Sequence, residues 1–257
     1  MDLQLKGKTA LVTGASRGIG LGVAEVFAAE GCNLHLASRN KADLDAAGDR
    51  IAAAKGVNVA THPLDLSVAE NAVKLARECG DIDILVNNAG AIPQGAITEV
   101  DDKTLRAAWD LKLFGYINLT REVYRRMCER RQGVIINVIG GAGERPTAAY
   151  IAGSIANSGL ITLSRALGAE SPNYGVRVVG LNPGPTATER GIEIWRTRAQ
   201  KEFGDAERWN DLTKGFPFGR PASVEEVANV VVFLASGRAS YVSGTVMNVD
   251  GGSAWRK

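Results

Sequence analysis

The chain has few of the residues that mark specialised classes of protein. Its 257 residues include only three cysteines and two histidines, and aromatic side chains make up 6% of the total. Cys32, Cys79 and Cys128 are odd in number, lie far apart and lack the spacing of metal ligands, which argues against a disulfide scaffold or a zinc site. We therefore expect three reduced thiols and no bound metal.

An excess of one charge and long apolar runs are also lacking. Thirty basic side chains against 28 acidic ones leave a formal net charge of +2, which gives little general attraction to nucleic acid or to anionic membranes. The basic stretch 121–131 has the pattern of a solvated helix face. No apolar run reaches about 18 residues, and the first residues do not form a secretory leader. The sequence predicts a cytoplasmic protein without nucleic-acid or membrane partners.

Short apolar runs alternate with longer amphipathic stretches along most of the chain. This alternation is typical of a single-domain, Rossmann-like doubly wound parallel sheet of about seven strands, flanked by helices. Strands are expected at 9–12, 33–37, 57–62, 84–86, 134–138, 176–181 and 245–249, and helices at 19–30, 41–54, 68–79, 104–130, 150–169 and 224–235. The polar and aromatic segment 184–221 breaks the rhythm and indicates either a substrate lid or a plain surface excursion.

The strongest motif follows the first predicted strand and precedes a predicted helix. It reads Thr13-Gly14-Ala15-Ser16-Arg17-Gly18-Ile19-Gly20. Gly14 can adopt a turn geometry closed to other residues, Gly18 lets the backbone approach a pyrophosphate, and Gly20 permits close helix packing. Because the helix then points its free N–H groups at the phosphates, the motif predicts a dinucleotide site.

The residues at the end of the second strand bear on the choice of cofactor. A carboxylate there would bind the ribose hydroxyls of NAD(H) and repel an additional phosphate, but the chain has Ser38 and Arg39. Arg39 and Arg17 could converge on a 2′-phosphate, with Ser38 as a further donor. The sequence therefore favours NADP(H) over NAD(H). In the alternative, Arg39 points to solvent or stacks on the adenine without discriminating.

The glycine spacing and several later motifs resemble the short-chain dehydrogenase/reductase family over almost the whole chain. The matching motifs are Asp65 at the third strand, Asn87-Asn88-Ala89-Gly90 after the fourth, Tyr150, Asn182-Pro183-Gly184 after the sixth, and Gly244 to Gly252. The resemblance implies that Asp65 and Leu66 flank the adenine and that Asn88, Ala89 and Gly90 contact the adjoining ribose. It also implies that Pro183, Gly184, Thr186 and Thr188 lie on the nicotinamide side, and that the protein forms homo-oligomers, either tetramers or dimers.

The same resemblance implies a catalytic tyrosine, a lysine four positions later, a serine and an asparagine. Tyr150 matches the tyrosine, whereas Ser154 stands at the lysine position, Gly140 at the serine position and Lys112 at the asparagine position. With Tyr150 and Ser154 at i and i+4 of one helix, both are expected to face one groove, where Ser154 could contact ribose. Lys112 is our candidate for the missing positive charge, with a purely structural lysine as the alternative. Asn137, Thr147 or a backbone N–H could replace the hydroxyl absent at Gly140.

Two functions remain open at this point. The first is NADP(H)-dependent reduction of a ketone to an alcohol, because an unperturbed phenol with a pKa of about 10 is already the acid that a developing alkoxide needs. The second is a catalytically inactive dinucleotide-binding protein with a regulatory or structural role. The aromatic residues of 184–221 suggest a bulky substrate, and His35 and His62, in predicted strands, are expected to be structural.

Overall fold

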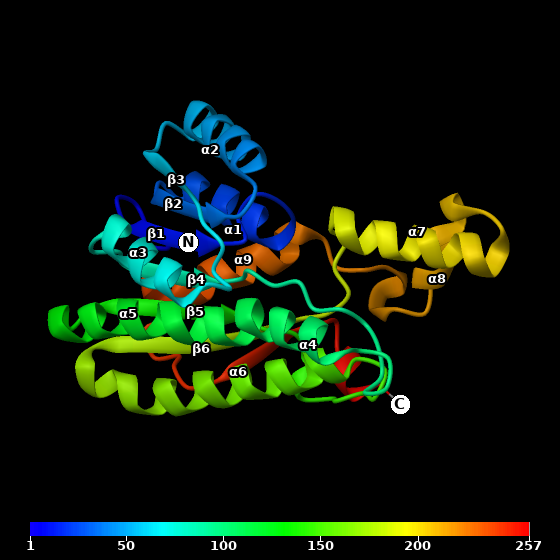
Figure 1. Ribbon diagram of the computed structural model, residues 1–257. Coiled ribbons are helices and arrows are strands. Elements are labelled where there is room, and N and C mark those ends of the chain that lie inside the picture. The colour runs from blue at the N-terminus through cyan, green and yellow to red at the C-terminus, as the bar shows by residue number, and fades with distance from the viewer. Residues whose placement is uncertain (257) are drawn as a thin grey trace.

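The computed structural model describes residues 1–256 and contains one parallel sheet between two layers of helices (Figure 1). The strands are β1 (Thr9–Thr13), β2 (Asn33–Ser38), β3 (Val59–Pro63), β4 (Ile84–Asn87), β5 (Gly133–Val138), β6 (Val176–Pro183) and β7 (Val246–Val249). Their order is β3-β2-β1-β4-β5-β6-β7, and every neighbouring pair is parallel. The order reverses between β1 and β4, and such a point opens a ligand crevice at the carboxyl ends of the strands. The predicted fold class is confirmed.

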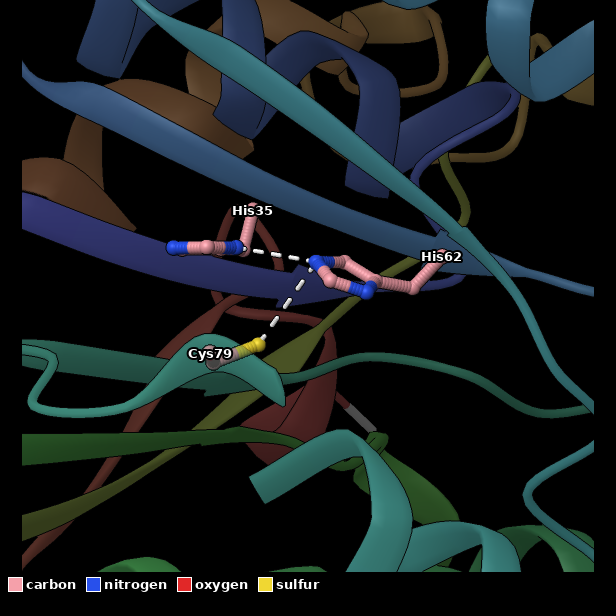
Figure 2. Close-up of side chains that lie close together, drawn as sticks. All are labelled: His35, His62 and Cys79. Carbon is pink, nitrogen blue, oxygen red and sulfur yellow. Dashed lines mark hydrogen bonds between the residues drawn. The ribbon is translucent and has the colours of Figure 1, made fainter. Parts of the chain in front are cut away.

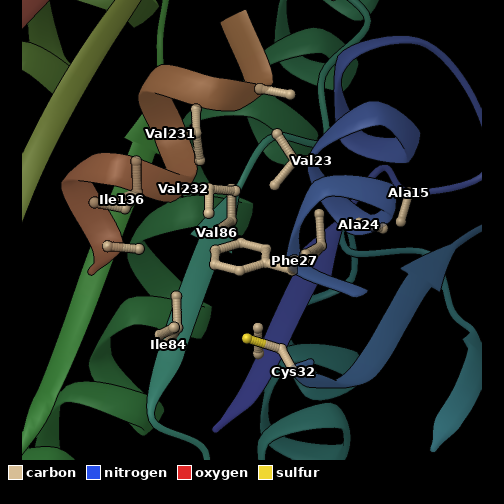
Figure 3. Close-up of a cluster of buried hydrophobic side chains, with 14 of the residues drawn as sticks. Ala15, Val23, Ala24, Phe27, Cys32, Ile84, Val86, Ile136, Val231 and Val232 are labelled. Atoms are coloured by element: carbon tan, nitrogen blue, oxygen red, sulfur yellow. The ribbon is translucent and has the colours of Figure 1, made fainter. Parts of the chain in front are cut away.

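The two faces of the sheet are covered by different helices. One layer holds α1 (Gly18–Ala29), α2 (Lys41–Lys55) and α9 (Val224–Ala235), and the other holds α3 (Ala69–Cys79), α4 (Asp102–Trp109), α5 (Gly115–Arg130) and α6 (Ile151–Glu170). Side chains alternate along each strand, so Val12 packs under the first layer and Leu11 under the second. Figure 3 shows Phe27 of α1 between β4 and α9, where it is fully buried. Within residues 1–256, none of the helices has the length and apolar character to cross a membrane.

The long helix predicted over 104–130 is interrupted in the structure. A π-helical turn, Asp110–Phe114, separates α4 from α5 and carries the buried Lys112. Gly115, the next residue, packs closely against the loop that follows β3. A Cβ at this position would come within 2.8 Å of Leu66 O. Wide turns of this kind are frequent at functional sites because they redirect a side chain without ending the helix.

The segment 184–221 is mostly helical and extends away from the sheet (Figure 1). It contains α7 (Glu189–Phe203) and α8 (Trp209–Thr213), joined by a short 3-10 turn. The Trp195 ring stacks on Trp209 with centroids 5.9 Å apart, and Phe216 meets Trp195 edge-on at 5.8 Å. These three aromatic rings therefore pack the segment together and are not evidence for a bulky substrate, whereas Phe218 is exposed.

A polar cluster lies under α3 at the outer strands of the sheet (Figure 2). His35 Nδ1 is 2.9 Å from His62 Nε2. His62 Nδ1 is in turn 3.2 Å from Glu78 Oε2. Cys79 Sγ lies 3.8 Å from His62 Nε2, so a histidine pair and a thiol meet although they are distant in sequence. The histidines link β2, β3 and α3, in line with the structural role predicted for them. The sequence spacing of these residues gave no sign of the cluster, because it forms only when the sheet brings β2 and β3 together beneath Cys79.

This cluster predicts a pH-dependent stability. Burial, and secondarily the neighbouring His62, lowers the pKa of His35 from its ordinary 6.5. The unfolded chain therefore takes up a proton near pH 6.5 that the folded chain resists, and the free energy of unfolding should fall as the pH drops through that value. Urea titrations between pH 5 and pH 8 should show this loss, and His35→Gln should reduce the slope. Parallel stability curves for the two proteins would contradict the assignment.

Candidate active site

A cavity of about 630 Å³ opens at the carboxyl ends of the strands, on both sides of the switch point between β1 and β4. It collects residues predicted from motifs that lie far apart in the sequence. The predicted residues that line it are Gly14, Ser16, Arg17, Gly18, Ile19, Ser38, Arg39, Leu66, Asn88, Ala89, Gly90, Lys112, Tyr150, Pro183 and Thr188. The glycine turn, the end of β2 and Tyr150 therefore share one site.

The glycine turn has the shape needed to hold a pyrophosphate. Gly14 and Gly18 have φ angles of +65° and +59°, in the left-handed region that favours glycine. A Cβ on Gly20 would lie 2.2 Å from Gly14 O, so only glycine allows α1 to start this close to the turn. Asn88 Nδ2 donates to Thr13 O at 3.0 Å and fixes the loop after β4 against the same turn. The open cradle and the N-terminus of α1 fit a dinucleotide phosphate.

The end of the cavity beside β2 is rich in donors. Ser38, Arg39 and Arg17 line it, as do Asn40 and Asp43, which the sequence reasoning missed. Asn40 Nδ2 donates to Asp43 Oδ2 at 2.6 Å, so one oxygen of the Asp43 carboxylate already has a hydrogen-bond partner. No carboxylate of residues 1–256 lies within 4 Å of either guanidinium, so both arginines are available to an anion.

Five predicted site residues do not line the cavity: Gly20, Asp65, Ser154, Gly184 and Thr186. Gly20 has the packing role predicted for it. Asp65 Oδ1 accepts bonds from the amide and hydroxyl of Ser67 at 3.0 and 2.8 Å, while its neighbours Leu64 and Leu66 line the wall. Thr186 Oγ1 donates to Gly184 O at 2.9 Å. These side chains shape the loops around the cavity.

Tyr150 lies just before α6 and reaches the cavity from there. Its φ and ψ of −138° and 47° are not helical, and the helix begins at Ile151. Its ring lies over Gly153, where an added Cβ would come within 2.0 Å of Tyr150 Cε1. The phenol therefore occupies the space that a side chain on Gly153 would take. Burial raises the pKa of Tyr150, and the positive charge of Arg190 opposes this shift. The phenol is neutral at ordinary pH.

Ser154 is directed away from the cavity. Its hydroxyl accepts a bond from the Thr147 amide at 3.1 Å and donates to Thr147 O at 3.3 Å, and the residue is 2% exposed. The prediction that Tyr150 and Ser154 face one groove is wrong, because the non-helical φ and ψ of Tyr150 at the N-cap of α6 turn its side chain out of line with that of Ser154. The i, i+4 backbone bond from Ser154 N–H to Tyr150 O, at 2.9 Å, is kept. Ser154 instead fixes the loop from Thr147 to Tyr150.

Lys112 projects from the π-helical turn into the wall of the cavity. Its Nζ donates to Val138 O and Ile139 O at 3.0 Å each and to the hydroxyl of Tyr116 at 3.3 Å. Its side chain crosses Gly90, where a Cβ would lie 2.7 Å from Lys112 Cδ. Burial lowers the pKa of Lys112 to about 8. Three acceptors thus hold the ammonium at the end of β5, and no direct hydrogen bond to Tyr150 occurs in the part of the chain that the structure describes.

The groups considered in place of the hydroxyl absent at Gly140 are mostly engaged. Asn137 accepts from Asn87 Nδ2 at 2.9 Å and donates to Ser164 Oγ at 2.9 Å, deep inside the protein. Asn137 is therefore excluded as a donor to substrate. Gly140 has a φ of +134°, and its N–H donates to Asn182 Oδ1 at 3.2 Å.

Asn157 was not predicted and lies directly beside Gly140. Its Nδ2 is 2.9 Å from the position of a Gly140 Cβ, and its Oδ1 is a buried acceptor without a partner among residues 1–256. A buried polar atom of this kind costs free energy unless a bound group or water pairs with it.

The far end of the cavity contains further residues that the sequence reasoning missed. Ile92 and Gln94 come from the loop after β4, and Glu189, Arg190 and Ile194 from the first turns of α7. Arg190 and Ile194 stand at i and i+4, so one face of α7 forms this wall. The sequence signal was a helical spacing after Thr188, but only the docking of α7 shows which face meets the cavity.

The fold and the cavity define a dinucleotide-binding protein of the doubly wound α/β class. A family model described as enoyl-(acyl carrier protein) reductase matches residues 14–254. The 3-oxoacyl-acyl-carrier-protein reductase of Escherichia coli is 36% identical over 256 residues, covering 97% of this chain and 98% of the relative.

Solved structures agree with this classification. L-sorbose reductase from Gluconobacter frateurii, complexed with NADPH and L-sorbose, superposes with a TM-score of 0.94 at 31% identity and full coverage of both chains. A structure described as a short chain dehydrogenase/reductase family protein gives 0.85 at 33% identity, covering 98% of this chain and 99% of the other. The chain belongs to the short-chain dehydrogenase/reductase family of oxidoreductases.

Proposed function

We propose that the protein is an NADP(H)-dependent oxidoreductase that reduces a ketone to an alcohol, with Tyr150 as the proton donor. One observation supports the proposal most strongly: a single cavity joins the glycine turn and two unpaired arginines to a partly buried, neutral phenol. Two of the proteins to which this chain is similar are named as reductases, and one of them binds NADPH. The similarity to these reductases supports the class of reaction. The roles of individual residues are argued from the cavity.

When bound, the nicotinamide cofactor would supply the hydride. The protein's part is to orient the carbonyl and to provide a proton. Tyr150 donates its hydroxyl proton to the carbonyl oxygen as negative charge develops there, which needs no prior deprotonation. Arg190 then stabilises the phenolate that remains, since a nearby positive charge favours the ionised form.

We also propose an atypical arrangement around Tyr150, in which Lys112 contributes positive charge to the cavity wall. Its ammonium is held by three fixed acceptors, so its position is set before any ligand binds. With a pKa of about 8 it is mostly protonated at pH 7. Ser154 acts in this arrangement as a positioning residue for the loop that carries Tyr150.

A panel of ketones assayed with NADPH and with NADH tests the proposed function. We expect reduction of at least one ketone with NADPH, and its loss in the Tyr150→Phe variant. Binding of NADPH without turnover of any ketone would instead indicate a dinucleotide-binding protein with a regulatory or structural role.

The cofactor preference gives a second prediction. Removing the guanidinium in Arg39→Ala should raise the Kd for NADPH roughly 10- to 150-fold, because a charge-assisted hydrogen bond contributes about 1.5–3 kcal/mol. The Kd for NADH should change little, since NADH lacks the 2′-phosphate. Fluorescence titration of both nucleotides measures the two constants.

Arg50 provides a matched control for this titration. It lies on α2 and pairs with Glu25 at 2.6 Å, outside the cavity. Arg50→Ala should leave both nucleotide affinities unchanged. Equal losses for NADPH and NADH in Arg39→Ala would show that Arg39 contacts a part common to both nucleotides.

A further inference from the structure

Arg190 is an arginine without a carboxylate partner at the substrate end of the cavity. Farther along α7, Arg196 pairs with Glu207 at 3.2 Å and Arg198 with Glu202 at 3.4 Å. Arg190 has no carboxylate of residues 1–256 within 4 Å, and the only polar contact of its side chain in that range is Nη2 to Ile92 O at 3.4 Å. Its charge is therefore free to meet a ligand.

The position of Arg190 in its helix is unfavourable without such a ligand. α7 begins at Glu189, so Arg190 is the second residue of the helix. Positive charge in the first turn opposes the helix dipole, whereas an anion in front of that turn is stabilised by it. The Thr188 side chain accepts from the Gly191 amide at 3.0 Å, which caps the helix and fixes the turn that carries Arg190.

Arg190 and Tyr150 both contact the region around Ile92. The guanidinium touches the carbonyl of Ile92, and the Tyr150 ring packs in the hydrophobic cluster that contains the Ile92 side chain. Both residues line the same cavity. A small molecule could therefore place one group on Arg190 and its carbonyl oxygen at Tyr150.

We propose that Arg190 is an anion-binding residue, and that the protein acts on small oxo acids, with the carboxylate on Arg190 and the ketone oxygen on Tyr150. This inference rests on the proposed reduction. A guanidinium is suited to this task because its planar donors match a carboxylate in two parallel hydrogen bonds. A phosphate ester would offer the same chemistry, so the test must separate the two anions. Glu189, on the same cavity wall, carries the opposite charge and would be the determinant for a cationic substrate.

The test compares neutral and anionic partners of one carbon skeleton. Straight-chain 2-oxo, 3-oxo and 4-oxo carboxylic acids, their methyl esters and a phosphate ester of a hydroxyketone are assayed with NADPH. We expect kcat/KM for the best acid to exceed that for its ester at least tenfold in the wild type. Arg190→Met should lower kcat/KM roughly 10- to 150-fold more for the acid than for the ester, because the ester loses only the effect of Arg190 on Tyr150. Arg190→Lys should recover part of the loss on the acid.

Arg198→Met, on the outward part of the same helix, is the matched control and should retain the preference for the acid. Equal rates for acid and ester in the wild type, equal losses on both in Arg190→Met, or a preference for the phosphate ester would overturn the oxo-acid assignment while leaving ketone reduction intact. If no compound turns over, the proposed reduction fails, and calorimetric titration of the acids and esters into the NADP⁺-loaded protein decides the anion site separately. Tighter acid binding that disappears in Arg190→Met supports the site, and equal binding refutes it.

Discussion

Replacing Tyr150 with phenylalanine is expected to lower the kcat for ketone reduction by roughly 10²- to 10⁴-fold, because that is the usual contribution of a positioned general acid. The Tyr150 hydroxyl is not a partner in any hydrogen bond among residues 1–256, and the ring is held by the cluster around Ile92. The variant should therefore fold normally. Single-turnover rates with bound NADPH measure the loss directly, and the Kd for NADPH should stay within about twofold of the wild type.

Gly153→Ala tests whether the position of the Tyr150 hydroxyl matters for catalysis. The added Cβ would overlap the Tyr150 ring at 2.0 Å, so the phenol must move while its hydroxyl remains. We expect kcat to fall in this variant as well, with cofactor affinity preserved. Gly159→Ala, in the same helix, serves as the control for changes in helix propensity, because its added Cβ meets only the end of the Leu113 side chain, at 3.2 Å. Full activity in Tyr150→Phe would exclude Tyr150 as the proton donor.

Replacing Lys112 with methionine is expected to have the second largest effect. Loss of the ammonium removes the positive charge from the cavity wall and leaves Ile139 O without its donor. We expect kcat/KM at pH 7 to fall roughly 10- to 150-fold, the range of a hydrogen bond to a charged group. Steady-state reduction measured from pH 6 to pH 9.5 gives both the size of the loss and its pH dependence.

The pH profile separates the charge of Lys112 from its packing. Because the pKa of Lys112 is lowered to about 8, the wild-type rate should fall as the pH rises through that value and the ammonium loses its proton. In Lys112→Met this alkaline limb should be absent, even if the variant is less stable. Lys103→Met, exposed on α4, should keep the wild-type profile. A limb near pH 8 that persists without Lys112 would assign the titration to another group.

The sequence predicted the sheet well because burial and periodicity are local signals. Six of the seven predicted strands begin within one residue of the observed start, and β3 begins at Val59 where 57 was predicted. The glycine turn was equally predictable, since Gly14 and Gly18 need backbone conformations that few other residues adopt. Predictions about the substrate end were weaker. Ser154 was assigned to the cavity from its spacing to Tyr150, but its hydroxyl bonds to Thr147 in the loop before α6, a contact that the spacing does not encode.

By itself, the sequence determined the doubly wound sheet, the nucleotide turn and the two arginines at the end of that turn and of β2, because each follows from residues close together in the chain. Only the tertiary structure decided that Lys112 turns inward at a π-helical turn, that the Tyr150 ring fills the space above Gly153, and that α7 turns Arg190 toward the same cavity. These facts depend on how helices dock at the carboxyl edge of the sheet. Docking is set by packing between segments that are far apart in the chain, which no local pattern encodes.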